Sequence, residues 1–190
     1  MKVKTKVIRQ SFILSCISVA LVLSLCSCSF VDRIALKVVG RSGHDAIFPL
    51  STSSIGSQFN VSYIYTKLVP TQPINACSRI SNANEVQNGI AFVIRGGCSF
   101  VTKASFAQAA GAVAFISYDY QNNSARILNM LPDETSTKVW IPCAFMQGSH
   151  AQHLLELMEL DNKTYLDVDF PVDQTGALII LDKYSPMRLR

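Results

Sequence analysis

The stretch Ile90-Ala-Phe-Val-Ile-Arg95, followed by Gly96-Gly-Cys-Ser99, decides how the middle of this chain folds. Its first five residues are apolar and predict a buried strand, and the double glycine predicts a tight turn. Residues 100–110 are rich in alanine and predict a helix, which Gly111 ends. The apolar run at 112–117 predicts a second strand. Together these elements span about thirty residues and form one β-α-β unit.

The rest of the chain predicts more strands than helices. Further strands are expected at 34–39, 59–65, 140–146, 164–170 and 177–181. Loops are expected at 40–43, 51–57 and 121–138. A second helix is expected from Ser149, with a capping box in which Ser149 and Gln152 satisfy each other's main-chain N–H groups. The sequence therefore predicts an α+β fold, β-dominated, in which two helices pack against the strands.

The first 28 residues have the layout of a secretory signal peptide. Basic residues at positions 2, 4, 6 and 9 precede an apolar run of about 14 residues, and Cys26-Ser-Cys28 offers small residues for cleavage. A membrane-spanning helix needs about 20 apolar residues, so this run is short for a permanent anchor. The alternatives are an uncleaved signal anchor and a bacterial lipoprotein cleavage box at 25–28.

Removal of this segment changes the charge balance. The chain has 17 basic and 13 acidic residues, and four of the basic ones but none of the acidic ones lie in residues 1–28. The mature chain is therefore electrically balanced, which indicates neither a nucleic-acid nor a membrane partner. No repeat or long linker divides it, so one domain is expected. We expect an N-terminal segment at 29–56, the domain core at 57–171, and a C-terminal strand and tail at 172–190.

Three tripeptides match the acceptor pattern for N-linked glycans. They begin at Asn60, Asn122 and Asn162. Such sites are used only in the secretory pathway, where the signal peptide would also direct the chain. The sequence thus predicts a secreted glycoprotein.

The β-α-β unit resembles the core of the protease-associated (PA) domain. The resemblance extends over roughly residues 57–170 and is carried by Ile94-Arg-Gly-Gly-Cys-Ser-Phe100 with Lys103, by Gly111–Ser117, by Leu68–Cys77 and by Ile141-Pro142. It implies a PA-domain-like sheet or barrel. It also implies a non-catalytic module that binds peptides or proteins, or that restricts access to an attached catalytic domain.

Three cysteines remain after signal cleavage, in a chain expected to fold in an oxidising compartment. An odd number allows at most one intramolecular bridge, and the resemblance implies that it joins Cys77 to Cys98. Cys143 lies on a short apolar strand and is expected to be a buried thiol. An intermolecular disulfide through Cys143 is the alternative, and a monomer is preferred.

Two groups of residues invite a catalytic or metal-site interpretation. Cys98 follows two glycines at a helix start, where a thiol could be activated, but a nucleophile would also need a positioned histidine. No partner motif surrounds any of the three histidines, His44, His150 and His153. His150 and His153 stand three apart, yet a solvated helix face explains them better than a zinc site, which needs further ligands. We therefore expect no catalytic residue, cofactor or metal.

These observations predict a secreted, N-glycosylated, non-catalytic PA-domain protein that acts through protein or peptide interaction, with an unknown partner. The alternative is a regulatory or accessory subunit of a separate peptidase. A weaker third hypothesis is a hydrolase that uses Cys98 or the histidines. The polar loop Gln121–Lys138 is the expected contact surface, because exposed loops on rigid scaffolds carry recognition.

Overall fold

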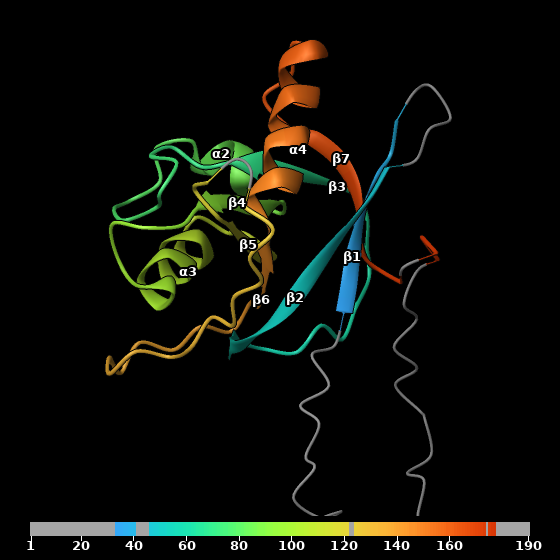
Figure 1. Ribbon diagram of the computed structural model, residues 1–190. Helices are drawn as coiled ribbons and strands as arrows, with labels where there is room; N and C mark the ends of the chain where they lie inside the picture. Colours follow the sequence, from blue (N-terminus) through green and yellow to red (C-terminus); the bar gives the residue numbers. More distant parts are fainter. Residues whose placement is uncertain (1–32, 41–45, 122–123, 174, 178–190) are drawn as a thin grey trace, which may run out of the picture. The chain divides into compact units, whose positions relative to one another are not determined.

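The computed structural model describes residues 33–40, 46–121, 124–173 and 175–177, which belong to one compact unit (Figure 1). Its strands are β1 (Arg33–Val38), β2 (Ala46–Gly56), β3 (Tyr63–Pro70), β4 (Ile90–Ile94), β5 (Ala114–Tyr118), β6 (Pro142–Met146) and β7 (Leu166–Val172). Its helices are α2 (Ala83–Val86), α3 (Phe100–Ala109) and α4 (Gly148–Leu160). The described helices include none that is long and apolar enough to span a bilayer.

The seven described strands form a closed barrel in the order β1-β2-β6-β5-β4-β3-β7. The pairs β3–β4, β4–β5 and β5–β6 are parallel, and the remaining pairs are antiparallel. Closure leaves no long unpaired edge. The predicted β-α-β unit is present as β4, α3 and β5, and the expected β-dominated fold is a barrel rather than an open sheet. β1 and β2, from the segment before the expected core, complete the barrel.

The barrel has two hydrophobic layers, which explains why β4 and β5 are apolar without alternation. Phe92 and Ile116 belong to the cluster inside the barrel, which Leu154 of α4 also joins. Phe115 belongs to the second cluster, together with Ala104 of α3. Parallel strands that are covered on both faces need apolar side chains on both. In Figure 1, α3 covers the outside of these strands and α4 stands over one end of the barrel.

The turn between β4 and α3 requires its glycines. Gly96 and Gly97 have φ angles of 101° and 84°, a region that other residues rarely adopt. A Cβ atom on Gly97 would lie 3.1 Å from the sulfur of Cys77. The next helix begins where Ser99 accepts a hydrogen bond from the main-chain N–H of Thr102, at 3.1 Å. The turn therefore brings Cys98 against the upstream cysteine.

One loop prediction was wrong, and one strand prediction was wrong in its bounds. The loop expected at 51–57 is the second half of β2, which pairs with β6 as far as Gly56. Its serines are not turn residues: Ser51 and Ser53 donate hydrogen bonds to a neighbouring loop, a tertiary role that local sequence does not reveal. The strand expected at 59–65 begins only at Tyr63 and continues to Pro70.

The predicted capping box of α4 was also wrong. The helix begins at Gly148, and its N-cap residue makes no side-chain hydrogen bond. The N–H of Ser149 donates instead to the carbonyl oxygen of Ser124 at 3.3 Å, and the amide of Gln152 donates to Glu156 at 2.9 Å. A loop from elsewhere in the chain thus does the capping.

Several predictions fall outside the described residues. These are the signal peptide at 1–28, His44, the acceptor Asn122, and the C-terminal strand and tail beyond Ala177.

Candidate protein-interaction surface

The long connection between β5 and β6 corresponds to the loop that the sequence analysis singled out. We call residues 124–140 the β5–β6 loop; they contain neither helix nor strand. The loop extends from the barrel on the same side as α3 (Figure 1). Although irregular, it is hydrogen-bonded to the barrel at its beginning and its middle and to α3 towards its end.

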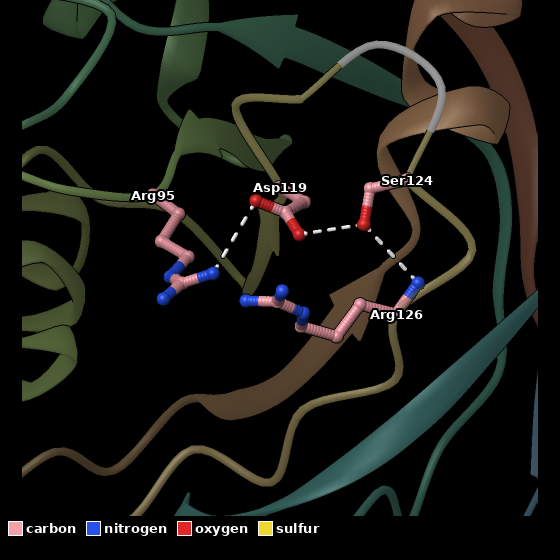
Figure 2. A network of polar contacts seen from close by, with 4 residues as sticks. All are labelled: Arg95, Asp119, Ser124 and Arg126. Atoms are coloured by element: carbon pink, nitrogen blue, oxygen red, sulfur yellow. Dashed lines mark hydrogen bonds and ion pairs between the residues drawn. The ribbon is translucent and has the colours of Figure 1, made fainter.

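The beginning of the loop is held by a buried carboxylate. The side chain of Asp119, just after β5, is fully buried and lies 3.3 Å from Nη1 of Arg95, which follows β4. The hydroxyl of Ser124 donates to the other carboxylate oxygen at 2.8 Å, and in turn accepts from the main-chain N–H of Arg126 at 3.1 Å (Figure 2). The charge of Asp119 is thus compensated, and the network ties the loop to the carboxyl ends of two parallel strands.

The middle of the loop lies along β2. The hydroxyl of Ser51 donates to the carbonyl oxygen of Leu128, and that of Ser53 to the carbonyl oxygen of Met130, each at 3.2 Å. The N–H of Ser54 donates to the same Met130 oxygen, also at 3.2 Å. Met130 is fully buried and belongs to the outer hydrophobic cluster. A polar loop therefore contributes one side chain to the core, which fixes its path.

The end of the loop is bound to α3. The hydroxyl of Ser99 donates a short hydrogen bond to the carboxylate of Asp133. This bond and one from Thr135 lower the pKa of Asp133 below its usual value. The side-chain oxygen of Gln108 accepts from the N–H of Trp140 at 2.6 Å. These bonds connect the second half of the β5–β6 loop to α3: Asp133 is held at the N-terminal end of the helix and Trp140 near its C-terminal end.

Three large apolar side chains of the loop point away from the core. Ile127, Leu131 and Trp140 are 57%, 63% and 68% exposed. The ammonium group of Lys138 lies 5.8 Å from the centre of the Trp140 ring. Tryptophan is enriched among the residues that dominate binding energy at protein interfaces. Because the hydrogen bonds already order the loop, binding through these side chains would cost little further conformational entropy.

The cysteines lie where the sequence predicts. Cys77 and Cys98 form a disulfide, so Cys98 has no free thiol to act as a nucleophile. Cys143 is a free thiol on β6 and is 2% exposed. Burial raises its pKa to about 12, which keeps it protonated and unreactive.

The histidines of α4 contact an aromatic ring rather than a metal site. The rings of His150 and His153 meet Phe48 edge to face, with centroids 5.9 and 5.5 Å apart. Within the described part of the chain, no three His, Cys, Asp or Glu side chains are grouped to hold a metal ion. The acceptor residues Asn60 and Asn162 are both exposed.

Sequence reasoning missed two buried charged residues, Asp119 and Lys103. Lys103 appeared only as part of a motif, and its burial depends on the disulfide segment that covers it. Asp119 follows an apolar strand directly, which is a weak signal for a fixed carboxylate. The burial of both side chains depends on segments that are distant in the sequence, so the sequence alone does not reveal it.

Comparisons with known proteins agree with the resemblance to the PA domain that the motif at residues 94–100 indicated. The family model described as the PA domain matches residues 64–154. A "PRADC1-like protein" of Drosophila melanogaster is 32% identical over 123 residues, which cover 63% of this chain and 63% of the relative. "Signal peptide peptidase-like 3" of Arabidopsis thaliana is 32% identical over 57% of this chain, but the match covers only 20% of that protein. The matched region is thus less than two thirds of either relative.

Among solved structures, the "Aminopeptidase from Aneurinibacillus sp. strain AM-1" matches 72% of this chain and 30% of its own, with a TM-score of 0.51 and 18% identity. At this identity the likeness concerns the fold alone.

Proposed function

We propose that this chain, whose residues 64–154 match the family model described as the PA domain, is a secreted, N-glycosylated protein without catalytic activity that binds another protein through the β5–β6 loop. The single observation that carries the interaction role is the exposure of Ile127, Leu131 and Trp140 on a loop that hydrogen bonds hold at its beginning, middle and end. A large aromatic group that stays exposed on an ordered loop supports a partner surface, because tryptophan is enriched among the residues that dominate binding energy at interfaces.

The non-catalytic part of the proposal has separate support. Cys98, the one candidate nucleophile on a helix start, is held in a disulfide. A relative that is 32% identical over 63% of this chain bears the name "PRADC1-like protein", which refers to no activity.

The test compares matched variants as baits. Ile127→Ser removes an exposed apolar group of the loop, and Ile64→Ser removes one of similar exposure, 53% against 57%, on β3. The secreted parent and three variants, Ile127→Ser, Trp140→Ser and Ile64→Ser, are used for affinity capture from conditioned medium, and the captured protein is then titrated against each by calorimetry. We expect Ile127→Ser and Trp140→Ser to weaken binding about tenfold and Ile64→Ser to leave it unchanged. Equal affinities for all four proteins would contradict the role of the loop.

Secretion and glycosylation are tested together. The full chain expressed in eukaryotic cells should appear in the medium without its first 28 residues or so, and N-glycosidase should lower its mass. Substituting Asn60, Asn122 and Asn162 singly by Gln identifies the occupied sites. A product that retains Met1 in the membrane fraction would support the uncleaved anchor instead.

A second candidate function is an accessory subunit of a separate peptidase. It is supported by the relative named "Signal peptide peptidase-like 3", which is 32% identical in the matching part and of which that part is only 20%. Co-purification of peptidase activity with the parent bait, lost with Trp140→Ser, would identify this role.

A further inference from the structure

Lys103 is the only charged residue of α3 and it is fully buried. Its ammonium nitrogen donates to the carbonyl oxygen of Asn75 at 2.5 Å and lies 3.4 Å from the sulfur of Cys77. Burial lowers its pKa to about 8, which still leaves most of the amine protonated at neutral pH. A buried positive charge is therefore directed at one of the two sulfur atoms of the disulfide.

The charged groups on the surrounding segments do not neutralise Lys103. Beyond Cys77, Arg79 is exposed, and before Cys98, Arg95 pairs with Asp119. Asp133 accepts from Ser99 at the start of α3. In the ranges that the structure describes, none of these residues forms an ion pair with Lys103. A buried cation without an anion is costly, so a negative charge formed at Cys77 would be stabilised.

The disulfide is not fully covered. Both cysteines are half-buried, and Gly96 and Gly97, which lie against the sulfur of Cys77, are exposed and have no side chains. The lysine lies beside Cys77, so attack of a thiolate on Cys98 is the course that leaves the negative charge next to the ammonium group.

We propose that the Cys77–Cys98 disulfide is a readily reduced bond and that Lys103 promotes its opening by stabilising Cys77 as the leaving thiolate. An external thiolate, from a small thiol or a thiol–disulfide oxidoreductase, attacks the sulfur of Cys98. The new sulfur–sulfur bond forms as the Cys77–Cys98 bond breaks, and the electron pair leaves on Cys77, next to the Lys103 ammonium. A second thiolate then releases Cys98, so the protein disulfide is reduced and two external thiols are oxidised to a disulfide.

A purely structural role of Lys103 predicts the opposite result. If the lysine only held the Asn75 segment in place, its removal would loosen the segment and make the disulfide easier to reduce. If it stabilises the leaving thiolate, its removal slows reduction, because a leaving thiol of higher pKa departs more slowly. The direction of the rate change therefore distinguishes the two roles.

The experiment measures reduction of the folded, secreted protein by dithiothreitol without denaturant, followed by alkylation and mass spectrometry. We expect Lys103→Met to slow reduction about three- to tenfold relative to the parent. Lys163→Met, which removes an exposed lysine, is the control and should have no effect. Unchanged or faster reduction of folded Lys103→Met would overturn the proposal.

Two measurements on the parent protein keep the test valid if Lys103→Met does not fold. The rate constant per reagent thiolate should fall as the pH rises through about 8, where Lys103 loses its charge. A constant value across that range would contradict the proposal. Brief treatment with glutathione should trap the mixed disulfide on Cys98, and trapping on Cys77 would contradict the assigned leaving group.

Discussion

The side-chain oxygen of Gln108 accepts the main-chain N–H of Trp140 at 2.6 Å, while the side chain of Trp140 is 68% exposed. The same oxygen also accepts from the N–H of Ile141 at 3.3 Å. One glutamine on α3 thus fixes the backbone beneath the most exposed aromatic group of the β5–β6 loop. The backbone of Trp140 is ordered while its side chain is exposed, so binding through this side chain would lose little further conformational entropy.

Replacing Gln108 with alanine should loosen the end of the loop. Both N–H groups lose their acceptor, and each such bond contributes about 1 kcal/mol or less when water can replace it. We expect faster hydrogen exchange at Trp140 and Ile141 and weaker binding of the captured partner, with little change in global stability. Gln152→Ala, which removes an exposed bond on α4, is the control. Unchanged exchange at residues 140 and 141 would contradict the anchoring role.

Replacing Asp119 with alanine should be far more damaging. The change leaves the guanidinium of Arg95 and the hydroxyl of Ser124 without their buried partner. Breaking a buried pair of this kind costs about 3 kcal/mol, whereas Ser124→Ala removes one hydrogen bond and should cost about 1 kcal/mol. Urea unfolding measures both values. Similar small losses for the two variants would show that Asp119 does not hold the network together.

Stability should depend on pH through His150. Burial, and secondly the neighbouring His153, lower the pKa of His150 below 6.5, so the folded protein binds the proton less readily than the unfolded chain. The contribution of neutral His150 to the free energy of unfolding is therefore complete above pH 6.5. It is lost as the pH falls below 6.5 toward the pKa of His150 in the folded protein. The free energy of unfolding of His150→Phe should fall less steeply than that of the parent as the pH is lowered below 6.5. Urea denaturation at a series of pH values measures this. Parallel curves for parent and variant would rule out this linkage.

The thiol of Cys143 should remain unreactive, and the protein should remain monomeric. Its thiol is buried, donates to the carbonyl oxygen of Ile141 at 3.4 Å, and has a pKa raised to about 12. A thiol reagent should label it only after unfolding, and a non-reducing gel should give a single monomer band. Rapid labelling of the native protein, or a dimer that Cys143→Ser abolishes, would support the intermolecular disulfide.

Local sequence determined the β-α-β unit because its signals act over neighbouring residues. Continuous apolar runs gave β4 and β5, the double glycine gave the turn, and Gly111, with a φ of 82°, ended α3. The bounds of these elements differ from the prediction by at most two residues. The motif around Arg95 and Cys98 was also specific enough to indicate the PA domain and its disulfide.

Only the tertiary structure decided which polar residues are fixed and which apolar residues are exposed. Ser51 and Ser53 looked like loop residues because their partners, Leu128 and Met130, lie far along the chain. Lys103 and Asp119 are buried because distant segments cover them. Sequence periodicity reports how a residue relates to its own helix or strand, and carries no signal for contacts made by loops. The sequence alone thus determined the β-α-β unit, whereas barrel closure placed the β5–β6 loop against β2 and α3 and made it a candidate binding surface.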